Sequence, residues 1–303
     1  MDGAVSEEYV RAAAIDWLAR TTLDGTVPIT RAQLANDFFV DGERFPLVDR
    51  GRGIRRPQGW SSALSILTAA PKGARWRPYD DSEGADGLHR YKLRRDKGGE
   101  GENEALRVAM QKQVPLIWFY GIQPSVFQAI FPVYLLWEEP AESQFVMALT
   151  EEQRLVRPDS PIEAALRRWN FAQTKRRLHQ AVFASQVKTA YDMRCAVCNL
   201  NQRELIDAAH IIPDTHPSGD AVVTNGLALC KLHHAAYDAN ILGIRPDLTV
   251  EIAGSLLEVS DGPMLRHGLQ GHHGRRLMRL PVRRADHPDA DRLAERYRLF
   301  RPV

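Results

Sequence analysis

The stretch "NGLALCKLHHAAYD" (residues 225–238) places an asparagine, a cysteine, two adjacent histidines and an aspartate within fourteen positions. Imidazole, thiolate and carboxylate groups are the side chains that bind metals and transfer protons near neutral pH. A short polar segment with a purely structural role rarely needs this mixture. The composition of the stretch therefore indicates metal ligation, acid–base chemistry, or both.

Two pairs of residues with the same spacing predict a metal site. "CAVC" places Cys195 and Cys198 with two residues between them, and "CKLH" repeats this spacing with Cys230 and His233 about thirty residues downstream. Paired motifs of this kind hold zinc in a closed tetrahedral Cys3His site. The alternative, three buried thiols and a surface histidine, is disfavoured by the repeated spacing. We therefore expect a structural zinc ion bound by these four residues.

The zinc site leaves other polar residues of this region without a role. His234 follows His233 directly, and Asp238 lies four residues further on, a spacing that puts both side chains on one face of a helix. Upstream, "LIDAAHIIP" (205–213) is a short β-prone segment that contains His210. "TNGLALC" (224–230) places Asn225 in a turn before the helix. The pattern predicts strand, turn and helix around one metal.

In this order, the residues resemble the HNH nucleases of the ββα-metal class. The resemblance covers about residues 190–245 and rests on "CAVC", "DAAHIIP", "NGLALC" and "KLHHAAYD". It implies hydrolysis of phosphodiester bonds, with His210 as the general base that takes a proton from water. It also implies that Asn225 holds the loop of His210, and that His234 binds a divalent cation, Mg²⁺ or else Mn²⁺ or Ni²⁺. The expected products carry 5′-phosphate and 3′-hydroxyl ends.

One position departs from the family pattern. Many members place a second metal ligand, histidine or aspartate, directly before the general base, where this chain has Ala209. We expect Asp238 to supply the missing ligand, because a helix fixes it beside His234. Asp207, three residues before His210, and water are the alternatives.

The N-terminal half predicts a mixed β core with accessory helices, so that the chain as a whole belongs to the α+β class. Residues 6–20 form an amphipathic pattern with Ser6 as N-cap, and 28–39 a second short helix capped by Thr30. A further helix is expected over residues 103–113. The expected β-strands lie at 89–95, 114–122 and 129–139, and the aromatic run Trp118, Phe119 and Tyr120 is expected in the core.

This half also resembles, more loosely, the PUA- or SRA-like domains that are fused to HNH nucleases in restriction systems. The resemblance implies a reader of methylated or hydroxymethylated cytosine in double-stranded DNA, by a groove contact or by a flipped base stacked between aromatic side chains. For each aromatic candidate, ordinary core packing is the alternative. The candidate DNA contacts are Arg52, Arg55 and Arg56 in a glycine-containing loop, with Trp60 and Tyr79 as stacking residues.

Charge and composition suggest how these parts are organised. Residues 161–190 carry six Lys/Arg and one Glu, and 266–284 form a second basic stretch. Such segments are typical of polyanion binding or of solvated helix faces. We expect a DNA-binding domain over 1–150, a basic helical linker over 151–190 and a nuclease domain with a C-terminal extension over 191–303. Within the linker, Arg176 and Arg177 are further candidate DNA contacts.

The remaining features indicate the cellular environment in which the protein works. The longest apolar run, "VPLIWFYGI" (114–122), is too short to span a membrane, and no basic segment followed by an apolar stretch opens the sequence. The three cysteines favour metal ligation over a disulfide framework. We therefore expect a cytoplasmic protein. Because cutting both DNA strands usually takes two active sites, we also expect a homodimer.

Two other functions fit the same residues. The first is an HNH endonuclease that cuts DNA without regard to modification. The second is a zinc-stabilised DNA-binding protein that has lost cleavage, for which Ala209 is the supporting feature. The complete set of His210, Asn225 and His234 favours an enzyme.

Overall fold

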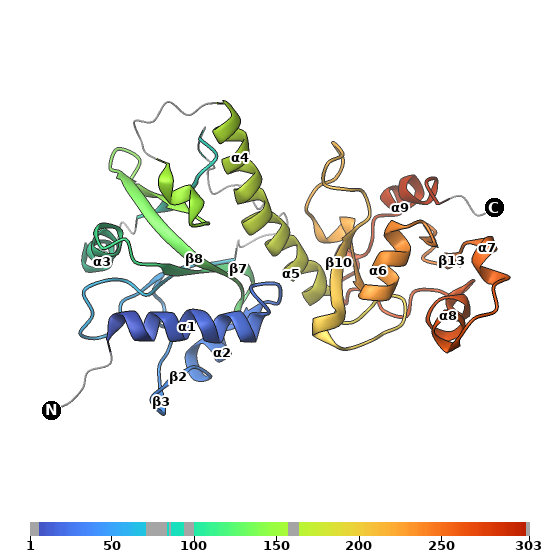
Figure 1. Ribbon diagram of the computed structural model, residues 1–303, viewed down its shortest axis with the longest axis horizontal. Coiled ribbons are helices and arrows are strands. Elements are labelled where there is room, and N and C mark those ends of the chain that lie inside the picture. The colour runs from blue at the N-terminus through green and yellow to red at the C-terminus, as the bar shows by residue number, and fades with distance from the viewer. Residues whose placement is uncertain (1–5, 71–83, 85, 94–99, 157–163, 301–303) are drawn as a thin grey trace. The chain divides into compact units, whose positions relative to one another are not determined.

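The structure of the protein is a computed structural model that describes residues 6–70, 84, 86–93, 100–156 and 164–300, with the backbone alone at 164–167 and 175–177. The chain forms two compact units, Met1–Val182 and Phe183–Val303 (Figure 1). Tyr79, one of the residues expected to stack on a base, lies outside the described residues.

The first unit is built around a mixed, curled sheet of seven strands. β5 and β7 are parallel, and the other neighbouring strands are antiparallel. The strand order is β4 (Ile54–Arg55), β5 (Ser65–Thr68), β7 (Leu116–Gln123), β8 (Val126–Glu139), β9 (Gln144–Ala148) and β6 (His89–Lys92), with β1 (Ile29–Thr30) also paired to β8. The expected α+β architecture is confirmed, whereas the PUA/SRA-like assignment stays a prediction.

The curl comes from β8, whose two halves pair with different long strands. Its first half, up to Val133, pairs with β7, and its second half, from Tyr134, pairs with β9. Both ladders contain register shifts, and irregularities of this kind bend a strand and increase its twist. The sheet therefore curls so that β6 at one end comes near β5, to which no strand pairing joins it.

The apolar run of β7 is continuous because both faces of this strand are covered. Trp118 and Tyr120 belong to one buried cluster, with residues of α3 (Glu100–Gln111). Ile117 and Phe119 belong to another, with residues of α1 (Glu7–Thr22) and α2 (Arg31–Asn36). Alternate side chains of a strand point to opposite faces, so a strand buried on both sides contains no polar alternation. The prediction that this run lies in the core is confirmed.

Local sequence signals account for the helices of this unit. The Ser6 side chain accepts a hydrogen bond from the Tyr9 amide and so begins α1, as expected. Thr30 and Gln33 form a capping box at the start of α2, which ends at Asn36, earlier than the predicted helix. Figure 1 shows α1 running along the sheet.

The expected linker is helical from residue 164. It consists of α4 (Ala164–Thr174), a π-helical turn (Lys175–Gln180) and α5 (Ala181–Ala190). Leu178 and Val182 are buried in the core of the first unit, whereas Phe183 and Val187 are buried in the second. The boundary between the two units therefore falls inside this segment. The side chains of Arg176 and Arg177 lie outside the described residues.

The second unit contains the strand–strand–helix arrangement expected from the sequence. β10 (Ile206–His210) and β11 (Gly226–Cys230) form an antiparallel pair, and α6 (Lys231–Asp238) follows directly. The described residues of the unit also form a second strand pair, β12 (Leu242–Ile244) and β13 (Val250–Ile252), and further short helices. These helices are α7 (Gly254–Leu257), α8 (Pro263–Gly268) and α9 (Ala290–Tyr297).

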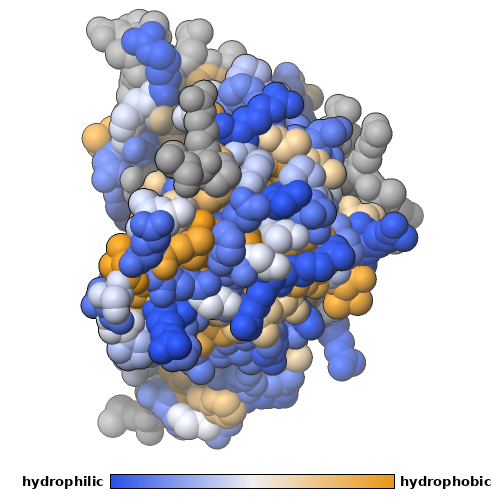
Figure 2. All heavy atoms as spheres, turned by 90° about the vertical axis from the view of Figure 1, so that its right-hand side faces the viewer, coloured by the Kyte–Doolittle hydropathy of each residue, from blue (hydrophilic) through white to orange (hydrophobic). Residues whose placement is uncertain are grey.

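The face of the molecule in Figure 2 is mostly hydrophilic, with apolar side chains gathered in small patches. Exposed apolar side chains of the second unit include Met264, Met278 and Val282. Among the described residues, the structure contains no helix with the length and apolar composition that crossing a bilayer requires.

Candidate metal centre and active site

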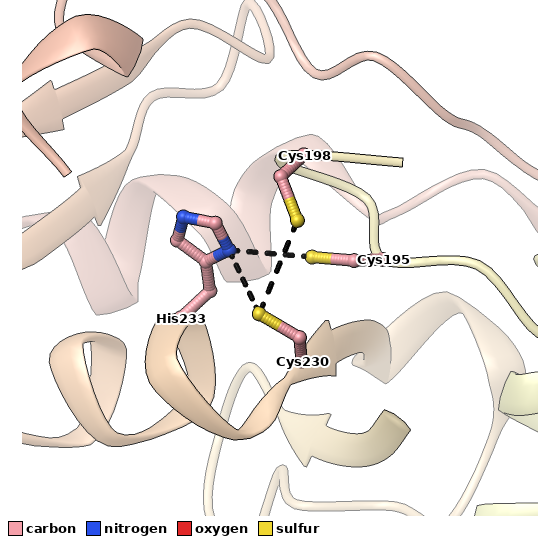
Figure 3. A group of neighbouring side chains, drawn as sticks. All are labelled: Cys195, Cys198, Cys230 and His233. Atoms are coloured by element: carbon pink, nitrogen blue, oxygen red, sulfur yellow. Dashed lines mark hydrogen bonds between the residues drawn. The ribbon is translucent and has the colours of Figure 1, made fainter. Parts of the chain in front are cut away.

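Three cysteines and one histidine from three segments meet at one point in the second unit (Figure 3). Cys195 and Cys198 lie in the turn after α5, Cys230 is the last residue of β11, and His233 lies in the first turn of α6. Their ligand atoms all lie within 4.8 Å of one another. The Cys230 and Cys198 sulfurs are 4.0 Å apart, and His233 Nδ1 lies 3.1 Å from the Cys230 sulfur.

This geometry fits a tetrahedral zinc ion. An ion about 2.3 Å from each sulfur would hold two sulfurs about 3.8 Å apart. His233 Nε2 donates a hydrogen bond to the Gly268 carbonyl over 2.8 Å, which fixes the ring with Nδ1 toward the cysteines. Contacts with Cys195 and Cys198, and then with His233, lower the pKa of Cys230, so a thiolate forms readily there. The Cys3His cluster is consistent with zinc, as the sequence predicts.

His210 lies at the end of β10, opposite Gly226 of β11. Its ring stacks on the ring of Phe183 from α5, with centroids 3.9 Å apart and an interplanar angle of 14°. Phe183 is 1% exposed. The strand pairing therefore fixes the backbone of His210, and Phe183 covers one face of its imidazole ring.

Asn225 fixes the start of the long connection between the two strands. Its Oδ1 accepts a hydrogen bond from the Ile212 amide, and its Nδ2 donates to the Ile212 carbonyl, each over 2.9 Å. Nδ2 also donates to the Asp220 carbonyl over 3.0 Å. The Asn225 side chain is completely buried and Ile212 is buried as well, so the Ile212 amide and carbonyl have little access to water. The loop that follows His210 is thus tied to the residue that precedes β11.

His234 contacts a carboxylate at each ring nitrogen. Nδ1 lies 3.2 Å from Asp207 Oδ2, and Nε2 lies 3.4 Å from Asp238 Oδ2. Asp207 also accepts a hydrogen bond from Lys231 Nζ over 2.7 Å. Burial would raise the pKa of Asp207, but the hydrogen bonds from Lys231 and His234 outweigh it and hold this pKa below its usual value. Both acidic residues named as candidate ligands therefore reach His234.

The candidate DNA contacts in the first unit differ in their availability. Arg52 and Arg56 are exposed. Arg55 donates to Asp49 Oδ1 over 2.7 Å and to the Pro46 carbonyl. Trp60 is packed beside Phe45, and the Arg11 guanidinium lies over its ring.

A cavity of about 180 Å³ lies in the first unit between β5 and β6, with Trp118 of β7 in its wall. Trp118 Nε1 donates to Thr68 Oγ1 over 3.0 Å, and the His89 ring lies 4.7 Å from the Trp118 ring. Neither nitrogen of His89 has a hydrogen-bond partner among the residues described. Burial lowers the pKa of His89 to about 3, so this ring is neutral at physiological pH. Tyr91 completes the aromatic lining.

Sequence reasoning missed Phe183, Lys231 and this cavity. Phe183 lies in a segment that stands out only for its charge, and nothing local links it to His210, 27 residues away. Lys231 has a local signal, because it immediately follows Cys230. The cavity residues come from three separate strands, so their proximity depends on the curl of the sheet.

With this geometry described, comparison with known proteins identifies a family within the second unit. Residues 195–245, which include the Cys3His cluster and the β10–β11–α6 arrangement, match a family model described as HNH endonuclease. The chain therefore contains an HNH endonuclease domain, and the protein is a nuclease that binds DNA.

No protein with a curated description matches the chain. Among solved structures, it is similar to a protein described as "Modification dependent TagI restriction endonuclease", at 17% sequence identity and a TM-score of 0.30. The match covers 90% of this chain and 92% of that one. At this TM-score the similarity does not establish a common fold.

Proposed function

We propose that the protein is a modification-dependent DNA endonuclease that hydrolyses phosphodiester bonds by a one-metal HNH mechanism. The observation that carries the catalytic half is that His210 ends β10, Asn225 directly precedes β11 and His234 lies in α6, beside the Cys3His cluster. A zinc ion held by the Cys3His cluster would fix the start of α6, the helix that carries His234. Catalysis and zinc binding thus use adjacent residues with separate roles.

In the proposed mechanism His210 takes the proton from the attacking water, because a histidine can accept a proton near neutral pH. Asn225 keeps the strand end and the loop around His210 in one conformation through its contacts with Ile212. His234 would hold a divalent cation, Mg²⁺ or else Mn²⁺ or Ni²⁺, with Asp207 or Asp238 as the second ligand. Such a cation would supply positive charge against the phosphate and the departing 3′ oxygen. The products carry 5′-phosphate and 3′-hydroxyl ends.

The carboxylates beside His234 support this assignment of the cation. Asp207 lies on the same strand as Ala209 and two residues before it, and alternate residues of a strand share one face. The side chain of Asp207 is 28% exposed, against 66% for Asp238. Asp207 is therefore the more firmly held of the two, although a helix also fixes Asp238 beside His234.

We infer that the first unit recognises methylated or hydroxymethylated cytosine in double-stranded DNA. The aromatic cavity supports this proposal, since a flipped base is held by stacking and by hydrogen bonds in a small pocket. Tyr91 and Thr68 are half-buried and supply an aromatic ring and a hydroxyl group, whereas the Trp118 and His89 side chains in the wall are buried. The exposed Arg52 and Arg56 are suited to phosphate contacts. The resemblance to PUA- and SRA-like domains points in the same direction.

A homodimer would provide one active site for each DNA strand. Free thiols that bind zinc suit a reducing compartment, so we place the protein in the cytoplasm. Sedimentation of the protein with and without DNA measures the state of association, and a monomer on cleaved duplex DNA would contradict the dimer.

The deciding experiment is the cleavage of one plasmid in three forms: unmodified, 5-methylated at cytosine and hydroxymethylated. Each form is incubated with Mg²⁺, Mn²⁺ or EDTA, beside the His210→Ala variant. Cleavage of the modified forms alone, abolished by EDTA and by the substitution, is the expected result. Equal cleavage of all three forms would leave an HNH endonuclease without modification dependence. Binding without cleavage under every condition would indicate a DNA-binding protein and direct attention to Ala209.

A further inference from the structure

The catalytic histidine candidate rests on an aromatic side chain from outside the HNH element. Phe183 of α5 lies parallel to the His210 ring at a centroid separation of 3.9 Å, closer than most aromatic pairs. Phe183 precedes the region that matches the HNH family model by twelve positions. The contact therefore comes from the helix that leads into the domain.

The residue opposite His210 makes this contact sterically possible. Gly226 pairs with His210 across the two strands. A Cβ atom at Gly226 would come 2.3 Å from Val187 Cγ2 and 3.1 Å from Phe183 Cζ, distances at which the helix would have to move. The Tyr191 hydroxyl donates to the Gly226 carbonyl over 3.3 Å. The absence of a side chain at Gly226 thus lets α5 pack against the strand pair, with Phe183 under the imidazole.

We propose that Phe183 is a positioning residue for the general base: it covers one face of the His210 ring and fixes the plane in which the ring nitrogens point. This proposal rests on the proposed role of His210. A ring whose plane is fixed presents its nitrogen to the attacking water in one direction. Proton transfer is then faster than from a ring that samples many orientations.

The stack also favours the charged state that forms during the reaction. When His210 takes a proton from water it becomes an imidazolium, and a cation over the face of an aromatic ring is attracted to its π electrons. This attraction is stronger in the transition state, where positive charge develops, than in the resting enzyme. An interaction of that kind raises the rate of the chemical step rather than the affinity for DNA.

The test compares Phe183→Leu with Val187→Ala. Both substitutions remove apolar volume from the same face of α5, and both original side chains contact Gly226, but the stack on His210 belongs to Phe183 alone of these two residues. The measurements are single-turnover cleavage of the plasmid form that the wild type cuts, the dissociation constant for that DNA in EDTA, zinc content and the thermal midpoint. Phe183→Met serves as a second variant of similar volume if Phe183→Leu does not fold.

We expect Phe183→Leu to lower the single-turnover rate by about 10- to 100-fold, with DNA affinity and zinc content as in the wild type. Val187→Ala should lower the thermal midpoint but keep the rate within about threefold. In the His210→Ala background, Phe183→Leu should have no further effect on residual cleavage, since the group that it positions is gone.

The outcomes separate the two proposals. If His210→Ala cuts like the wild type, His210 is not the general base and the proposed mechanism fails with it. If His210→Ala is inactive but Phe183→Leu and Val187→Ala lose rate equally, the mechanism stands and the positioning role of Phe183 is refuted. A loss of DNA affinity that accounts for the whole effect of Phe183→Leu would also refute it.

Discussion

His234 Nδ1 lies 3.2 Å from Oδ2 of Asp207, a residue of the strand that carries the general base candidate. The family pattern places a ligand immediately before this base, where the chain has Ala209. Asp207 lies on the same strand two residues before Ala209, so the side chains of these two residues point to the same face of the strand. The contact shows that the alanine does not leave His234 without an acidic neighbour.

This arrangement predicts unequal effects for the two carboxylates beside His234. Asp207→Asn should raise the Mg²⁺ or Mn²⁺ concentration for half-maximal cleavage by about 10- to 100-fold, since it removes a fixed charge at the cation. Asp238→Asn is the matched control, because its side chain is 66% exposed and less constrained. Metal titration of single-turnover cleavage measures both effects. The reverse order would identify Asp238 as the second ligand.

A second prediction concerns Asn225. Asn225→Ala leaves the Ile212 amide and carbonyl buried without their partners, at a cost of about 1–3 kcal/mol for each unpaired group. We expect a lower thermal midpoint and loss of cleavage, with zinc retained. Asn225→Asp keeps an acceptor for the Ile212 amide, but it buries a carboxylate whose second oxygen faces the Ile212 and Asp220 carbonyls, so it should be inactive and also destabilised. Normal cleavage by Asn225→Ala would show that catalysis does not depend on the hydrogen bonds between Asn225 and Ile212.

Removal of zinc should unfold the second unit alone. All six tryptophans of the chain precede residue 183, so their fluorescence reports on the first unit. A strong chelator, or Cys198→Ala, should abolish cleavage and reduce the circular dichroism of helices, with little change in tryptophan emission. Acid should act in the same direction as a chelator, because protons compete with zinc for the thiolates. Cleavage by metal-depleted protein would contradict a structural role for this cluster.

If the cavity in the first unit binds the modified base, substitutions in it should reduce the preference for modified over unmodified DNA. They should leave the chemistry of cleavage unchanged. Tyr91→Ala and Thr68→Val should reduce the preference for modified over unmodified DNA by roughly tenfold or more, as expected when base stacking is weakened. Tyr9→Ala removes an aromatic ring that is 54% exposed on α1 and serves as control. Competition binding with modified and unmodified duplexes measures the ratio. An unchanged ratio in both cavity variants would place recognition elsewhere in the unit.

The ion pairs of Arg90 predict a pH dependence of stability. Arg90 contacts both Asp86 and Glu139. Burial would raise the pKa of Glu139, but hydrogen bonds from Arg90 and Gln144 lower it below its usual value. Glu139 therefore stabilises the fold above its unfolded pKa of about 4.3, and this contribution is lost as the pH falls through the folded pKa.

The comparison of Glu139→Gln with the wild type tests this dependence. Tryptophan fluorescence follows the thermal midpoint of the first unit for both proteins between pH 7 and pH 3. The variant should unfold at a lower temperature at pH 7, and the two midpoints should converge in acid. A difference that persists unchanged in acid would assign the effect to packing.

Local spacing explains why the second unit was the more predictable one. Cys195 and Cys198 share one turn, and Cys230 and His233 share one strand–helix junction, so sequence distance translates directly into geometry. The Ser6 cap and the buried run of β7 are local in the same sense. These features needed no knowledge of how distant segments pack.

The features that escaped prediction depend on packing between distant segments. Phe183 reaches His210 because Gly226 lets the helix approach the strands. His89 and Trp118 meet because the sheet curls. The sequence suggests that Arg55 contacts DNA, but it does not reveal that Arg55 forms an ion pair with Asp49.

Val182 and Phe183 are neighbours in α5, yet they are buried in different cores. Among the described residues, Val182 is the last residue of one core and Phe183 the first of the other. The ring that stacks on His210 therefore belongs to the residue at which the second core begins, one peptide bond after the first core ends.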